Sequence, residues 1–274
     1  MRYLHRLLRP FLALPLLGAV QLSHAEVDDS LVAAIDSIWQ TPPPQVSLLS
    51  EHFDNRTSNA GTAYRAEVKG SPTYLVTGDE AASVVAGRKR FNAVSTPWGN
   101  FPKLQMQNAR LLEMRLPKKR YRILAGPGVG LFSVGDWQRY SFLHVLDVST
   151  PSAPVYYPLF SDAYLGERVL GQLPDSAVLN FARLVPSSRS GDGSTDAYEV
   201  TLYALGHKGP QPVIKDGHVL AYALKREDGS WVISSLDRAV ATNARDEEKR
   251  PFVAAPRPAL FVNAPPAAAV TDKQ

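Results

Sequence analysis

The pattern of apolar and polar positions predicts many short β-strands from residue 104 onward. Apolar residues alternate with polar ones or form short runs, and turn residues such as Thr150-Pro151 and Gly209-Pro210 separate these stretches. The clearest hairpin is the last one, because apolar residues alternate on both sides of Asp228-Gly229. The predicted strands cover residues 104–116, 120–124, 129–134, 140–148, 155–159, 178–185, 197–205, 218–225 and 230–236.

This series of strands predicts a mainly β fold, built as an antiparallel sandwich, a barrel or a curved sheet, with α+β as the alternative. The segment Gly126-Pro127-Gly128 is typical of a turn between two of the strands, because glycine and proline disfavour strand interiors. The glycine-rich segment 191–196 is predicted to be a hairpin tip. It lacks the spacing of an EF-hand calcium loop.

One or two short helices are predicted near the start of the chain. Asp29 or Ser30 can cap the first helix, which the prolines at 42–44 follow. Its apolar residues fall on one helical face. They are Leu31, Ile35, Ile38 and Trp39.

The segment between residues 51 and 93 mixes several signals. Residues 51–61 are polar and typical of turns, and residues 62–68 and 73–77 predict a pair of strands. Asp79 is predicted to cap a second helix that ends near Phe91.

The first 25 residues have the three parts of a cleavable secretory signal peptide. Three arginines precede an apolar stretch at 11–22, and Ser23-His24-Ala25 gives a small-x-small cleavage pattern. This stretch is shorter than the ~20 residues that a membrane-spanning helix needs. We therefore expect a mature chain that begins at Glu26 and works in the periplasm or outside the cell.

These patterns divide the chain into four segments that differ in composition. Residues 1–25 are the signal peptide, and residues 26–44 hold the first helix and a proline-rich connector. Residues 45–243 are expected to form a single mainly β domain. Residues 244–274 are first highly charged and then rich in proline and alanine, which predicts a disordered tail.

The composition excludes several kinds of chemistry. The chain has no cysteine, so disulfides, thiol catalysis and cysteine-ligated metal sites are excluded. Without the signal peptide, 27 basic residues face 26 acidic ones, and such a balance gives no general reason to bind nucleic acid. No cofactor or transmembrane segment is expected in the mature chain, and its oligomeric state is not indicated.

Basic residues are concentrated between positions 88 and 122. This segment holds ten lysines or arginines and one acid, Glu113. On an extended strand, Lys118, Arg120 and Arg122 share one face, which we expect to be exposed. An anionic envelope polymer or an envelope protein is the partner that this pattern favours. A set of ordinary solvated strand faces is the alternative.

Aromatic residues are concentrated between positions 137 and 164. If exposed, Trp137, Tyr140, Tyr156 and Tyr157 would form a platform for sugar rings or for a partner chain. The alternative, which the pattern favours, is that these rings fill the core of a β fold.

Catalytic motifs give no clear signal. The motifs of serine hydrolases and of zinc proteases are missing. Ser141, His144 and Asp147 are close in sequence, but an odd spacing on a strand sends Ser141 and His144 to opposite faces. His144 is therefore predicted to be a buried or half-buried strand residue.

Three functions remain open from the sequence. The pattern favours an exported, non-enzymatic binding or assembly module of the cell envelope. The first alternative is an envelope glycan hydrolase with paired carboxylates. The second is a structural component of a larger exported machine, which predicts a long unpaired edge strand or an exposed apolar patch. The candidate acids of the hydrolase are Asp136, Asp147, Asp162 and Glu167.

Overall fold

The prediction of a mainly β fold is confirmed by a computed structural model. It describes residues 28–39, 43–58, 61–66, 74–77, 82–86, 89–93, 98, 103–104, 106–129, 140–191 and 194–239. Antiparallel strands form three open sheets, and one α-helix, α1 (Asp29–Asp36), precedes them. The predicted signal peptide and tail lie outside the described residues. Among the residues that the structure describes, no helix has the length and apolar character needed to cross a bilayer.

The central sheet has the strand order β1-β8-β9-β10-β11, and β7 pairs with the end of β9. A single turn of 3-10 helix, η1 (Met106–Asn108), connects β7 to β8. The strands are β1 (Gln45–Ser50), β7 (Lys103–Leu104), β8 (Arg110–Leu116), β9 (Lys119–Val129), β10 (Ser141–Asp147) and β11 (Val155–Ser161).

The second sheet has the order β12-β13-β14-β17-β16, with β15 paired to β14 and β18 paired to β17. The 3-10 helix η3 (Gly166–Val169) leads into it. Its strands are β12 (Leu170–Gly171), β13 (Asn180–Arg189), β14 (Thr195–Gly206), β15 (Gly209–Pro212), β16 (Ile214–Lys215), β17 (His218–Glu227) and β18 (Ser230–Ala239).

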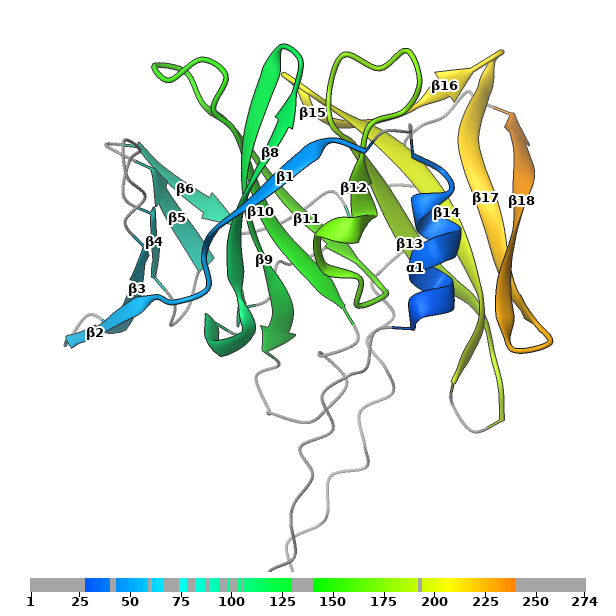
Figure 1. Cartoon of the computed structure of the whole chain (residues 1–274), viewed down its shortest axis with the longest axis horizontal. Coiled ribbons are helices and arrows are strands. Elements are labelled where there is room, and N and C mark those ends of the chain that lie inside the picture. Colours follow the sequence, from blue (N-terminus) through cyan, green and yellow to red (C-terminus); the bar gives the residue numbers. More distant parts are fainter. Residues whose placement is uncertain are drawn as a thin grey trace, which may run out of the picture.

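The third sheet is a meander in chain order, β2-β3-β4-β5-β6. It lies on one side of the central sheet, and the second sheet lies on the other side (Figure 1). Its strands are β2 (Asp54–Ser58), β3 (Gly61–Ala66), β4 (Tyr74–Thr77), β5 (Ala82–Ala86) and β6 (Lys89–Ala93).

Two apolar cores lie on opposite faces of the central sheet. Successive side chains of a strand point to opposite faces. Leu143 of β10 therefore enters the first core, which is shared with α1 and the second sheet, while Phe142 enters the second core. That other core includes Ala66 and Val84 of the third sheet. Every residue of β10 is consequently buried. This explains why β10 shows a continuous run rather than an alternation of apolar residues.

Helix α1 buries the predicted face, since Leu31, Ile35, Ile38 and Trp39 are all buried. The predicted cap was wrong by one residue. Asp28 is the N-cap, and its Oδ1 accepts the backbone N–H groups of Ser30 and Leu31. Its Oδ2 accepts the indole N–H of Trp231 at 2.8 Å, which ties the start of the helix to β18.

The predicted second helix was wrong, because its residues form β5 and β6. Val84 pairs with Val76 of β4 and is fully buried in the second core, so sheet pairing overrides the helical pattern. The polar segment 51–61 likewise contains β2. The described residues therefore contain one α-helix, α1.

The predicted turn at Gly126-Pro127-Gly128 was also wrong, because these residues continue β9 to Val129. Gly126 pairs with Phe142 of β10. A Cβ atom added there would lie 3.1 Å from the Cα of Ala109, so glycine allows a close approach of the chain. The Asp228-Gly229 hairpin is confirmed. Both residues have positive φ, at 48° and 82°, as a type I′ turn requires.

Candidate functional site

One end of the central sheet carries most of the exposed basic residues of the predicted block. The β8–β9 hairpin ends in a turn at Pro117 and Lys118, and Arg115 of β8 pairs directly with Arg120 of β9. All three basic side chains are exposed. Lys118 lies in the turn rather than in the strand, so its predicted alternation with Arg120 does not apply.

The neighbouring turn between β10 and β11 extends this surface. The backbone N–H of Arg120 donates to the hydroxyl of Ser149, and the backbone N–H of Val148 donates to the carbonyl of Arg120. The ammonium group of Lys89, on β6, donates to the carbonyl of Ser152 at 2.9 Å. We define the basic end as Lys89, Arg115, Lys118 and Arg120.

Arg122 does not belong to that surface, because it is 5% exposed. Its Nε lies 2.7 Å from a carboxylate oxygen of Glu113, which is also buried. The other Glu113 oxygen accepts a hydrogen bond of 2.6 Å from Arg115. The prediction that Lys118, Arg120 and Arg122 share one exposed face was therefore wrong for Arg122, which is buried. A buried carboxylate holds Arg122 inside, where an unpaired charge would be costly.

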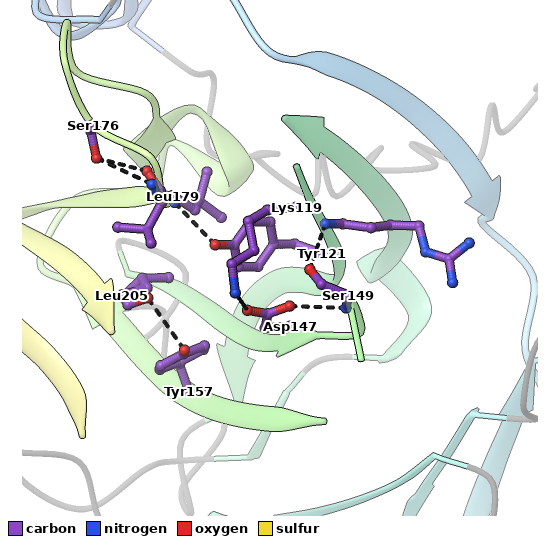
Figure 2. A network of polar contacts seen from close by, with 10 residues as sticks. Lys119, Tyr121, Asp147, Ser149, Tyr157, Ser176, Leu179 and Leu205 are labelled. Carbon is purple, nitrogen blue, oxygen red and sulfur yellow. Dashed lines mark hydrogen bonds and ion pairs between the residues drawn. The ribbon is translucent and has the colours of Figure 1, made fainter. Parts of the chain in front are cut away.

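Lys119 points to the opposite side and is neutralised there (Figure 2). Its ammonium donates to Asp147 Oδ2 at 2.7 Å, while Asp147 Oδ1 accepts the backbone N–H of Ser149. Burial alone would raise the pKa of Asp147, but Lys119 and Ser149 hold it below its usual value.

Two buried tyrosines link this network to the second sheet (Figure 2). The Tyr121 hydroxyl accepts the backbone N–H of Leu179, and the Tyr157 hydroxyl donates to the carbonyl of Leu205 at 3.3 Å. Burial raises the pKa of Tyr121 to about 12, so its phenol stays protonated near neutral pH. These contacts indicate a structural role for the inner side of the network.

Within the basic end, Arg115 pairs with Glu113, but the charges of Lys118 and Arg120 are not balanced locally. The described segments that build it are 43–50, 89–93, 110–122 and 140–158, and their acidic residues are Glu113 and Asp147. Both are buried. Asp147 pairs with Lys119, and Glu113 pairs with Arg122 and with Arg115 of the basic end. Within the described part of the chain, neither Lys118 nor Arg120 makes an ion pair. This surface can therefore attract an anion.

The predicted aromatic platform is not assembled as expected from the described residues. Trp137 lies outside them, and Tyr157 is 1% exposed in the first core. Tyr140 and Tyr156 are half-buried and pack against the second core. The Tyr156 hydroxyl lies 2.6 Å from Nδ1 of His144. The predicted aromatic platform was therefore wrong for these tyrosines. Their rings mainly fill the cores, which was the alternative interpretation of the sequence.

His144 is buried, as predicted, and it faces the second core. Burial lowers its pKa to about 3, so the imidazole is neutral at physiological pH. Ser141 faces the other side, where its hydroxyl donates to the carbonyl of Ala163 and accepts the backbone N–H groups of Leu165 and Gly166. The two residues cannot act together in a triad.

Two of the candidate carboxylates of a glycan hydrolase, Asp147 and Asp162, are far apart. Asp147 ends β10, whereas Asp162 follows Ser161, which pairs with Ser141 at the other end of that strand. Six residues of extended chain place the two acids ~20 Å apart, well beyond the 5–10 Å of glycosidase pairs. Glu167 forms an ion pair with Arg110 at 2.7 Å, and Asp136 lies outside the described residues.

Asp162 has the most perturbed carboxyl group of the described residues. Burial raises its pKa to about 6, although Arg183 and Arg189 favour the charged form. The guanidinium of Arg183 lies 3.7 Å from the carboxylate and stacks over the rings of Trp98 and Phe160. This cluster joins the end of β11 to β13.

Replacement of Asp162 by asparagine should change how stability depends on pH. A folded-state pKa above the unfolded value means that the folded protein binds more protons between pH 4 and 6. The Asp162 contribution therefore falls as pH rises through this range. We expect the stability of Asp162→Asn relative to the original protein to be greater at pH 7 than at pH 4.5, as measured by urea unfolding. An equal difference at both pH values would contradict this.

No known family model, curated protein or solved structure matches this chain. Within the described ranges, no group of three or more His, Asp or Glu residues is arranged to hold a metal ion. Sequence reasoning missed the inward roles of Glu113 and Asp147. The signal that could have found the first of these is the register of the β8–β9 hairpin, which pairs Glu113 directly with Arg122.

Proposed function

We propose that this chain is an exported, non-enzymatic binding module of the cell envelope, and that its basic end binds an anionic partner. The observation that carries the proposal is the exposure of Lys118 and Arg120 on a surface whose neighbouring acids are buried and already paired. The signal-peptide pattern of residues 1–25 supports export.

The ion pairs below the basic end favour binding without a large rearrangement of the β8–β9 hairpin. The β8–β9 hairpin is fixed beneath by the Glu113–Arg122 ion pair and beside by the Lys119–Asp147 pair. Exposed lysine and arginine side chains on such a support steer an anionic polymer or protein by long-range attraction, which salt weakens.

Replacement of Lys118 and Arg120 by glutamine should weaken binding to heparin, an anionic polysaccharide, by about tenfold at low salt. The reason is the loss of two charge contacts, each worth up to about 1 kcal/mol near an anionic surface. The measurement is retention on a heparin column, with the salt concentration varied. The loss should shrink as salt rises.

The matched control replaces Lys225 and Arg226, which are exposed on β17 in another sheet. It removes the same charge from a surface that also carries Glu227 and Asp228. We expect little change in retention. Equal losses for both double variants would show that the binding follows net charge, and the proposal would then fail.

A further inference from the structure

Three side chains that donate hydrogen bonds form a row across the first three strands of the central sheet. Gln45 of β1 pairs with Arg115 of β8, and Arg115 pairs with Arg120 of β9. Directly paired residues place their side chains on the same face of a sheet, and all three residues are exposed. We call them the donor row, which presents one amide and two guanidinium groups on one face.

The two arginines of the donor row lie at the closer of the two antiparallel spacings. The backbone N–H of Arg120 donates to the hydroxyl of Ser149, and its carbonyl accepts the N–H of Val148, so both groups point away from β8. Arg115 and Arg120 are consequently a pair without mutual backbone hydrogen bonds, with Cα atoms about 4.5 Å apart. Like charges directly opposite each other at such a pair are destabilising.

The charges around the donor row leave an excess of two positive charges. The next row inward on the same face holds the buried pair of Glu113 and Arg122. The Glu113 carboxylate contacts Arg115 at 2.6 Å and Arg122 at 2.7 Å. Three guanidinium groups therefore share one carboxylate, because within the described part of the chain Arg120 makes no ion pair.

Part of the Arg115 guanidinium remains available to a second acceptor. Its Nε and Nη2 atoms both contact the same oxygen of Glu113, and its side chain is 57% accessible. Among the residues that the structure describes, none contacts its Nη1 atom through a hydrogen bond or ion pair. Since a guanidinium carries five N–H donors in a planar fork, its outer side can bind another anion.

We propose that Arg115 and Arg120, together with the amide of Gln45, bind a terminal phosphate group. This assignment rests on the proposed function of the basic end and names the chemical group that the basic end recognises. A terminal phosphate carries up to two negative charges and three acceptor oxygens, so it neutralises the excess charge and serves both guanidinium forks. A carboxylate has one negative charge and two oxygens, and it can match only one fork.

Titration with glucose 6-phosphate and glucose 6-sulfate at pH 7.5 and constant ionic strength tests this assignment. The two esters share the sugar, but the phosphate is largely dianionic at this pH and the sulfate is monoanionic. The signals are the backbone amide NMR resonances of Arg115 and Arg120. We expect the dissociation constant of the phosphate ester to be at least tenfold lower than that of the sulfate ester.

Inorganic phosphate serves as a third probe, which distinguishes two sources of the same group. Binding of inorganic phosphate at least as tight as that of glucose 6-phosphate would assign the site to free phosphate. Weaker binding of inorganic phosphate would assign it to a phosphate carried by a larger molecule.

A double variant that keeps the charge tests the role of the two forks. Arg115→Lys, Arg120→Lys retains both positive charges, so its retention on heparin should stay close to that of the original protein. Its dissociation constant for glucose 6-phosphate should rise at least tenfold. The control, Lys225→Gln with Arg226→Gln on β17, should leave that constant unchanged.

A single variant tests the repulsion within the donor row. Without ligand, Arg120→Gln should have a thermal midpoint no lower than that of the original protein, because Arg115 no longer faces a like charge. Saturating glucose 6-phosphate should raise the midpoint of the original protein by about 3 °C and that of Arg120→Gln by much less.

Two results would overturn the phosphate assignment. They are equal dissociation constants for the two esters, and a lysine double variant that binds glucose 6-phosphate as the original protein does. Either result leaves the proposed function intact as long as Lys118→Gln with Arg120→Gln still lowers retention on heparin. Loss of that effect on heparin retention would instead contradict the proposed function itself.

Discussion

Replacement of Gly171 by alanine should lower the free energy of unfolding by about 3 kcal/mol. The added Cβ would lie 2.2 Å from Cδ2 and 2.4 Å from Cγ of Trp39, so the indole ring would have to move. That ring is buried, and its N–H donates to the carbonyl of Arg168 at 3.1 Å. Urea unfolding with a tryptophan fluorescence signal measures the loss.

The control for this prediction is Gly191→Ala, because a Cβ at Gly191 meets no atom within 4 Å. We expect its stability to change by less than about 0.5 kcal/mol. A smaller residue at position 39 should relieve the clash, so Trp39→Leu should destabilise the Gly171→Ala protein less than it destabilises the original one. An alanine at 171 without effect would mean that the ring of Trp39 does not pack on Gly171 of β12.

Replacement of Glu113 by glutamine should also cost about 3 kcal/mol. The change leaves the guanidinium of Arg122, which is 5% exposed, without its buried carboxylate. The measurement is again urea unfolding at pH 7.

Arg115→Gln is the matched comparison, because Arg115 contacts the same carboxylate from an exposed position, with a side chain 57% accessible. We expect it to cost less than about 1 kcal/mol. The double variant Glu113→Met, Arg122→Leu should be more stable than Glu113→Gln, since apolar residues can replace a buried ion pair. Equal costs for Glu113→Gln and Arg115→Gln would show that the buried pair contributes no more than a surface one.

Sequence reasoning succeeded where local chemistry determines the conformation. Asp228-Gly229 forms the predicted turn because both positions require positive φ, which these two residue types tolerate. The apolar stripe of α1 likewise determines its buried face. In both cases the signal lies within a few neighbouring residues.

It failed where partners distant in sequence decide the structure. Gly126-Pro127-Gly128 has the composition of a turn, yet pairing with β10 keeps it in a strand. Val84 takes part in β5 because β4 and the second core provide its contacts. Neither partner can be identified from the local pattern.

The candidate site was predicted only in part, because one of its contacts also depends on a residue elsewhere in the chain. The concentration of basic residues located the β8–β9 hairpin, where Arg120 is exposed as expected and Lys119 lies on the other face, paired with Asp147. The burial of Arg122 depends on Glu113, nine positions earlier, and that pairing follows from the hairpin register. The sequence pattern alone placed Arg122 on the surface.

A photo-crosslinking residue at position 118 tests the proposed function most directly. In living cells that export the chain, position 118 should give a discrete crosslinked product, and Arg120→Gln should reduce it. The same residue at position 226, which is exposed in another sheet, should not give that product. Identical products from positions 118 and 226, or none from position 118, would contradict a binding role for the basic end.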